Sequence, residues 1–207
     1  GITYMNKLWV FGDSMSRNHN HNLVKDNDKL LWPAIIADKL NMSLNNLAEN
    51  GIGNDSIFRN LINNLYKIKT NDYVIIGLTN PIRHNIIIDD KDEMMPFYLE
   101  YNAVENKRKV MLSQYQDEIV FKAHDKLLER DYEKAINIQK ILTKLNIDSI
   151  LWSWYTQDEV EKEYKYDRTK DYHFSYKGHN QFAYRLLEQI YNKETIWYNI
   201  YERYSNI

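Results

Sequence analysis

Short apolar runs alternate along this chain with longer segments whose apolar residues recur every three or four positions. The short runs predict buried strands at Lys7–Phe11, Ser43–Ala48, Asp72–Leu78 and Asp148–Trp152. The periodic segments predict helices at Trp32–Leu40, at Asp55–Ile68, at Ser175–Tyr191 and in a long segment whose inward face is Leu128, Tyr132, Ala135, Gln139 and Leu142. Strands that alternate with helices predict a parallel sheet with helices on both faces.

The predicted fold class is therefore α/β, a three-layer α/β/α arrangement around a flavodoxin-like parallel sheet of about five strands. The fifth strand is expected between Trp154 and Asp171, where Tyr164–Tyr166 marks it only weakly. Residues 81–125 are longer than a simple crossover needs, so they predict an insertion, a loop with an extra helix, over one edge of the site. A chain of 207 residues with 43% apolar content fits one domain, residues 1–207.

The composition argues against several classes of partner. Lys and Arg total 27 against 29 Asp and Glu, so the chain lacks the positive field that a nucleic acid would need. No cysteine is present, which excludes disulfides, thiolate metal sites and cysteine nucleophiles. Near the N-terminus the longest apolar run is Leu8–Phe11, too short for a signal peptide or a membrane span. We expect a soluble protein, with the compartment open and the cytoplasm favoured.

The beginning of the chain predicts little more. Met5-Asn6-Lys7 looks like a natural start, so Gly1–Tyr4 is expected to be an added remnant, although a removed leader would leave the same trace. Nothing in the sequence indicates an oligomeric state.

Polar motifs follow the predicted strands. Phe11-Gly12-Asp13-Ser14 ends the first strand, Asn50-Gly51-Ile52-Gly53-Asn54-Asp55 follows the second, and Thr79-Asn80-Pro81 follows the third. Asp171-Tyr172-His173 precedes the final helix. Because the carboxyl ends of parallel strands meet at one edge of a sheet, these four motifs are predicted to lie together.

This series resembles the motifs of the SGNH/GDSL hydrolase family, and the resemblance runs from Trp9 to about Leu187. In that family Gly-Asp-Ser carries a serine nucleophile, and a late Asp-x-(x)-His completes its triad. The resemblance implies that Ser14, Asp171 and His173 are catalytic. It also implies a serine esterase that needs no metal and no organic cofactor.

The chemistry of these residue types agrees with that assignment. A serine hydroxyl is a weak nucleophile until a base accepts its proton, and histidine is the side chain that exchanges protons near neutral pH. Asp171 would orient the His173 ring and stabilise its cation. The short spacing from Asp171 to His173 favours this pair over Asp167 and over His179, which is expected to be structural within the last helix.

The negative charge that develops on the ester oxygen needs hydrogen-bond donors. The predicted oxyanion hole consists of the N–H of Ser14, an N–H of Gly53 or Asn54, and the side-chain amide of Asn80. Asn54 stands where many members of the family have a glycine, which is tolerable because only its N–H is needed. Asn80 precedes Pro81, so a plain turn-forming role is its alternative.

Three further residues beside these motifs, Asp13, Arg83 and His84, are predicted to contact the substrate. For Arg83 and His84 the alternative is that they hold the 81–125 insertion in place. His19 and His21 have no carboxylate at ligand spacing, so we interpret them as exposed polar residues and predict no metal site.

The favoured function is hydrolysis of short-chain acyl esters, acetyl above all, on a carbohydrate or other polar small molecule. The preference for sugars rests on a polar, aromatic-rich chain, with 17 tyrosines and 5 tryptophans, and on the known range of the family, which includes lipases and thioesterases. A lipolytic esterase, a thioesterase and an acyltransferase are alternatives on the same site. A catalytically silent binding module would be favoured if Asp171 and His173 lay far from Ser14.

Overall fold

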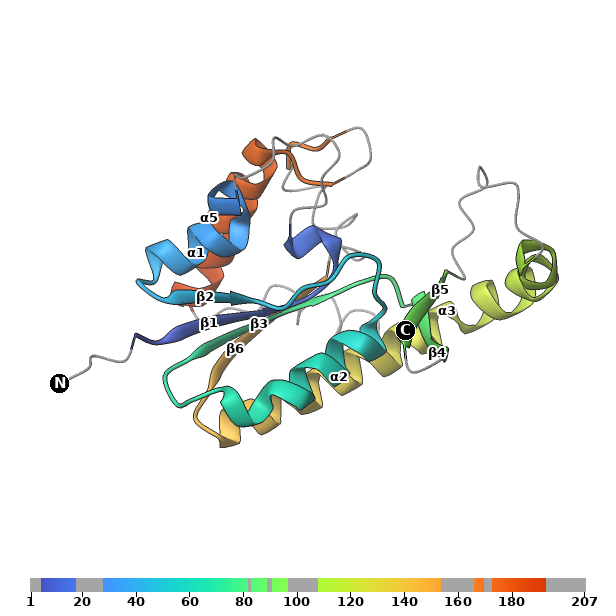
Figure 1. Ribbon diagram of the computed structural model, residues 1–207, viewed down its shortest axis with the longest axis horizontal. Coiled ribbons are helices and arrows are strands. Elements are labelled where there is room, and N and C mark those ends of the chain that lie inside the picture. The colour runs from blue at the N-terminus through green and yellow to red at the C-terminus, as the bar shows by residue number, and fades with distance from the viewer. Residues whose placement is uncertain are drawn as a thin grey trace.

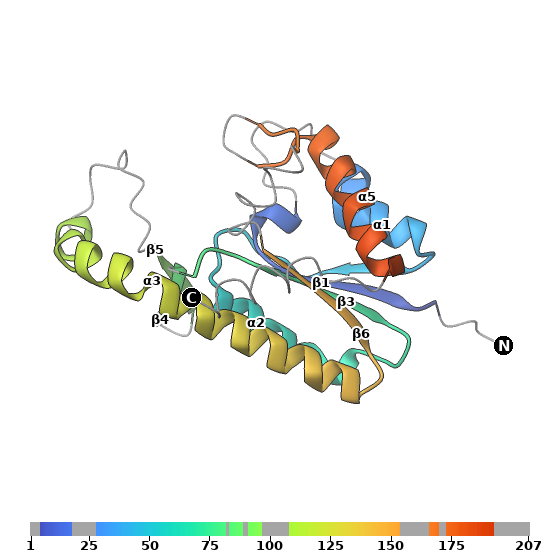
Figure 2. The same cartoon turned by 180° about the vertical axis from the view of Figure 1, so that it is seen from behind.

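The computed structural model describes residues 5–17, 28–81, 83–88, 91–96, 108–153, 166–169 and 173–192. A parallel sheet with the strand order β2-β1-β3-β6 forms its centre (Figure 1). The strands are β1 (Lys7–Phe11), β2 (Ser43–Asn46), β3 (Tyr73–Leu78) and β6 (Asp148–Ser153). Helices α1 (Trp32–Lys39) and α5 (Tyr176–Asn192) cover one face, while α2 (Asn54–Asn64) and α3 (Arg108–Lys144) cover the other (Figures 1 and 2). The predicted three-layer α/β/α class is confirmed.

The sheet separates two hydrophobic cores, one on each face, and the central strand β1 contributes side chains to both. Successive side chains of a strand point to opposite faces, so β1 sends Leu8 and Val10 into the core under α1 and α5. Trp9 and Phe11 enter the core under α2 and α3. Because both faces are buried, the strand reads as a continuous apolar run in the sequence, which made it predictable.

The helices bury the faces that their periodicity predicted. In α3 the buried stripe includes Tyr132, Ala135 and Leu142, and in α5 it includes Phe182 and Leu186. Pro33 lies in the first turn of α1, where its missing N–H costs no hydrogen bond. Short 3-10 turns complete the described elements: η1 (Ser14–Ser16), η2 (Asp28–Leu30) and η3 (Leu65–Lys67).

The segment predicted as a loop with an extra helix differs from that prediction. Residues Arg83–Ile88 (β4) and Lys91–Pro96 (β5) form a two-stranded antiparallel sheet. The extra helix is continuous with the next one, so α3 runs unbroken from Arg108 to Lys144. Its first turns run past the sheet, on the side where the strands end (Figures 1 and 2).

Other predictions differ in length or fall outside the described residues. Strand β2 ends at Asn46, and α2 ends at Asn64 before η3 begins. The described part of the main sheet has four strands, and most of the region expected to hold a fifth lies outside the described residues. Within the described ranges no helix has the length and apolarity to cross a bilayer.

Candidate active site

Ser14 lies in a tight turn directly after β1. Asp13 caps this turn, because its Oδ1 accepts a hydrogen bond from the N–H of Met15 at 3.0 Å. A Cβ on Gly12 would lie 2.5 Å from Oγ of Ser16, so a larger residue here would force the Ser16 side chain to move. The indole Nε1 of Trp32 donates to the carbonyl of Met15 at 2.9 Å. The sequence Gly-Asp-Ser therefore builds a rigid turn that holds the serine at the end of the strand.

His173 lies beside this serine although 159 positions separate them in the chain. Nε2 of His173 is 2.9 Å from Oγ of Ser14. In the tautomer that carries its proton on Nδ1, Nε2 accepts the hydrogen bond from the serine hydroxyl. Ser14 is buried, with 6% of its surface exposed. The pair has the geometry of a nucleophile and its general base.

The segment around His173 is fixed by its own backbone. The N–H and the hydroxyl of Thr169 both donate to the His173 carbonyl, at 2.8 Å and 3.0 Å. Ser175 then caps α5, because its Oγ accepts from the N–H of Gly178 at 3.1 Å. Gly178 packs so tightly that a Cβ there would lie 1.9 Å from the Asp167 carbonyl oxygen. These contacts position the imidazole over Ser14.

Asp167 and His179, the rivals considered from the sequence, have partners of their own. The Asp167 carboxylate accepts a hydrogen bond from the Ser175 hydroxyl, so it helps to hold the start of α5. His179 is buried in α5, and its Nδ1 accepts from the N–H of Trp32 at 3.4 Å. Burial, with a smaller effect from His173, lowers the pKa of His179 to about 4. Asp171 lies outside the described residues, so its role stays a prediction.

The loops after β2 and β3 are fastened to each other by one side chain. Oδ1 of Asn54 accepts from the N–H of Thr79 at 2.8 Å, and Nδ2 of Asn54 donates to the Thr79 carbonyl at 3.0 Å. Asn54 is the first residue of α2, after the cap Gly53, and Asn80 directly follows Thr79 and is buried. The two loops predicted to supply oxyanion donors therefore lie side by side.

Within the described part of the chain, the N–H of Ser14 and the N–H of Asn54 have no protein acceptor. Asn54 begins a helix, whose first N–H groups have no partner within the helix and carry a partial positive charge. Groups of this kind stabilise negative charge on a nearby oxygen.

Asp13 and Arg83, predicted as substrate contacts, bind each other. Nη1 of Arg83 lies 3.0 Å from Oδ2 of Asp13 and 2.9 Å from Oγ1 of Thr79. Arg83 begins β4, so this contact agrees with the alternative that it holds the insertion in place. His84 lies within β4, opposite Met95 in the register of the hairpin.

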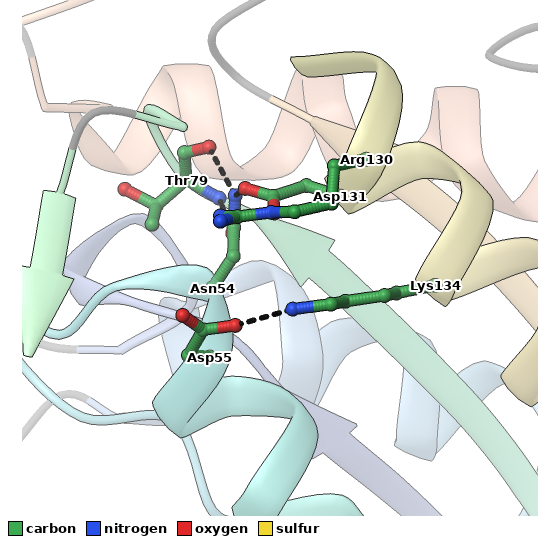
Figure 3. Close-up of polar contacts among 6 residues, drawn as sticks. All are labelled: Asn54, Asp55, Thr79, Arg130, Asp131 and Lys134. Atoms are coloured by element: carbon green, nitrogen blue, oxygen red, sulfur yellow. Dashed lines mark hydrogen bonds and ion pairs between the residues drawn. The ribbon is translucent and has the colours of Figure 1, made fainter. Parts of the chain in front are cut away.

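A buried carboxylate of α3, not predicted from the sequence, completes the surroundings of Asn54. Oδ2 of Asp131 accepts from Nδ2 of Asn54 at 2.8 Å, and Oδ1 accepts from Nε and Nη2 of Arg130 at 3.0 Å and 2.8 Å (Figure 3). Burial raises the pKa of Asp131, and these hydrogen bonds oppose the rise. The available signal was a charged residue in line with Ala135 and Leu142 on the buried stripe of α3.

Among the side chains that the structure describes, no three His, Cys, Asp or Glu residues are grouped so that they could hold a metal ion. His19 and His21 lie outside the described residues.

No protein-family model and no curated protein matches the chain. Solved structures similar to it include a member of the lipolytic G-D-S-L family from Veillonella parvula, with 14% identity over 88% of this chain and 96% of the other, and a TM-score of 0.42. Another is a family two carbohydrate esterase from Clostridium thermocellum, described in complex with cellohexaose. Its identity is 18%, over 91% of this chain and 64% of the other, with a TM-score of 0.43.

A third is a lipase/acylhydrolase from Enterococcus faecalis, with 12% identity over 91% of this chain and 97% of the other, and a TM-score of 0.43. The similar structures thus include a protein of the family that the sequence motifs resemble. Because these TM-scores lie below 0.5, the chemistry of the site is inferred below from this chain's own residues.

Proposed function

We propose that this protein is a serine hydrolase that cleaves carboxylic esters through a covalent acyl-serine intermediate. The observation that carries the proposal is the 2.9 Å distance between Oγ of Ser14 and Nε2 of His173. A silent binding module has no need for a buried serine held against a histidine from the far end of the chain. An activated serine needs such a base within hydrogen-bond reach.

The first half of the reaction forms the acyl-enzyme. His173 accepts the proton of the Ser14 hydroxyl while Oγ attacks the carbonyl carbon, and the carbonyl oxygen becomes an oxyanion. The N–H groups of Ser14 and of Gly53 or Asn54, with the side-chain amide of Asn80, are the proposed donors to that oxyanion. When the carbon–oxygen bond to the alcohol breaks, His173 returns the proton to the leaving oxygen.

The second half repeats these steps with water. His173 takes a proton from the water molecule, whose oxygen attacks the acyl carbon, and the proton then returns to Ser14 as the carboxylic acid leaves. Asp171 is proposed to keep the imidazole in the correct tautomer throughout. The chain's own residues supply every proton transfer in this scheme.

The proposed substrate is a short-chain ester, acetyl above all, of a carbohydrate or another polar small molecule. Its support is the sequence: a polar chain with 17 tyrosines, a residue type that combines an apolar ring able to stack on a sugar with a hydroxyl able to hydrogen-bond to it. Initial rates on esters of graded acyl length, alongside acetylated sugars, test this choice. Rates that rise toward long chains would favour a lipolytic enzyme, and an acceptor alcohol that outcompetes water would favour an acyltransferase.

The test of the activity itself is the substitution Ser14→Ala. It removes only a hydroxyl, so folding should be preserved, with a stability change of roughly 0.5–1 kcal/mol. Ester hydrolysis should be abolished. Full activity of a folded Ser14→Ala protein would contradict the proposal.

A further inference from the structure

A continuous series of hydrogen bonds joins helix α3 to the turn of Ser14. Asp131 accepts from Asn54 at 2.8 Å, and Asn54 holds both backbone polar groups of Thr79. The hydroxyl of Thr79 accepts from Arg83 at 2.9 Å, and Arg83 donates to Asp13 at 3.0 Å. Asp13 then caps the turn that carries the serine. Figure 3 shows the end of this series at α3.

Burial of the Asp131 carboxylate at this position has an unfavourable desolvation free energy. Only 1% of its surface is exposed, and carboxylates are almost never buried to this degree unless they are paired. An apolar residue here would simply continue the stripe of Ala135 and Leu142, and replacing buried charges by apolar groups often stabilises a fold. A contribution to stability is therefore a weak explanation for this carboxylate.

The hydrogen bond between Asp131 and Asn54 supplies a better explanation for the buried carboxylate. A carboxylate only accepts hydrogen bonds, so only the NH2 end of the Asn54 amide can face it. With that end fixed, Oδ1 of Asn54 must face the N–H of Thr79, as observed. Rotation of the amide by half a turn would set oxygen against oxygen and break the bonds to Thr79 and to Asp131 together. Asp131 thus reinforces the orientation that the N–H and the carbonyl of Thr79 impose on the Asn54 amide.

We infer that Asp131 is a positioning residue for the oxyanion hole, an inference that rests on the function proposed above. Acting through Asn54, it fixes the backbone of Asn54 relative to that of Thr79. This in turn fixes two proposed oxyanion donors: the N–H of Asn54 and the side-chain amide of Asn80, the residue after Thr79. The hydrogen bonds of the Asp131 side chain within the described residues go to Asn54 and Arg130, and not to Ser14. Its effect should therefore appear in the transition state, where the oxyanion forms, and hardly in substrate binding.

A matched control lies close by on the same two helices. Nζ of Lys134 is 2.8 Å from Oδ1 of Asp55, so this ion pair also connects α3 to α2 (Figure 3). Both of its side chains are about half exposed, and neither belongs to the series of bonds described above. The substitution Lys134→Met breaks this link between α2 and α3 and removes none of the hydrogen bonds of Asn54 or Asp131.

The experiment compares kcat and KM of Asp131→Ala, Asp131→Asn and Lys134→Met on one short-chain ester. We expect Asp131→Ala to lower kcat by roughly 10- to 100-fold, because small displacements of catalytic groups have costs of that size, with KM within about twofold. Asp131→Asn should be intermediate, since its Oδ1 can still accept from Asn54. Lys134→Met should match the wild type in both constants.

A double-mutant cycle separates positioning from general structure. If Asp131 acts through Asn54, Asp131→Ala should cost little further kcat in a protein that already carries Asn54→Ala. Losses that multiply instead would overturn the inference. If Asp131→Ala fails to fold, judged by its melting temperature, Asp131→Asn takes its place in the cycle.

The outcomes also distinguish this inference from the proposed function. A wild-type protein with no Ser14-dependent hydrolysis would overturn the proposed function, and this inference with it. Ser14-dependent hydrolysis with an unchanged kcat in the Asp131 variants would overturn the inference alone.

Discussion

Nη1 of Arg83 lies 3.0 Å from Oδ2 of Asp13, so this ion pair joins the start of β4 to the turn that carries Ser14. The Asp13 side chain is 2% exposed and that of Arg83 21% exposed. Two residues that the sequence suggested as substrate contacts are thus engaged with each other. Their proposed role becomes that of holding the nucleophile turn, and Arg83 connects that turn to Thr79 as well.

We predict that Arg83→Met lowers the free energy of unfolding by about 3 kcal/mol, because it leaves the buried Asp13 carboxylate without its cation. Denaturant unfolding measures this loss. The control is Lys126→Met, which breaks the ion pair of Lys126 with Glu129 on the surface, where water and salt screen it, and should change stability little. An Arg83 variant as stable as that control would contradict the role of the ion pair.

From the buried His179 we predict a specific pH dependence of the free energy of unfolding. Burial lowers its pKa to about 4 from the usual 6.5, so the folded protein favours the neutral ring. Protonation would also remove the acceptor of the Trp32 N–H. The stability from this site is therefore complete above pH 6.5 and is lost as the pH falls toward 4, by at most about 3 kcal/mol.

The measurement is the free energy of unfolding of wild type and His179→Gln between pH 7 and pH 4. Glutamine keeps an acceptor but does not titrate, so the variant should lose less stability on acidification than the wild type. Parallel losses in the two proteins would show that other groups cause the acid sensitivity.

Asn80 has two competing roles with opposite consequences. If Asn80 is an oxyanion donor, Asn80→Ala should lower kcat by roughly 10²–10³ with little change in KM. Asn80→Asp should then be at least as damaging. The aspartate replaces a donor by an acceptor and adds a negative charge beside the forming one. If Asn80 only forms a turn, Asn80→Asp should have a nearly normal kcat, because aspartate before proline supports a turn almost as well as asparagine does. Rates of both variants on one short-chain ester, with melting temperatures as a control, decide between the roles.

Much of the fold was predictable because burial on both faces leaves a clear record in the sequence. Strand β1 occupies the predicted residues Lys7–Phe11, and α5 differs from its prediction by a single residue at each end. The hairpin of β4 and β5 was missed because Lys91–Pro96 begins with three charged residues and ends in proline. The sequence between the two strands, Asp89-Asp90, also lacks the Asn-Gly or Asp-Gly signal of a tight hairpin turn.

The proximity of Ser14 and His173 followed from a simple rule, since parallel strands bring their carboxyl ends to one edge. The contact between Asp131 and Asn54 follows no such rule, because it joins a helix to the first residue of another helix 77 positions away. Side chains that satisfy one another across such distances, as Arg83 and Asp13 also do, are not visible in a single sequence. The sequence could thus suggest the reacting groups, but not the residues that hold them in place.

The central claim is that His173 activates Ser14. An organophosphonate ester that traps activated serines tests it directly, with the labelled residue identified by peptide mass spectrometry. We predict labelling of Ser14 alone in the wild type, and a labelling rate that is lower by roughly 10³-fold or more in a folded His173→Ala protein. Label on another residue, or an unchanged rate in His173→Ala, would contradict the account.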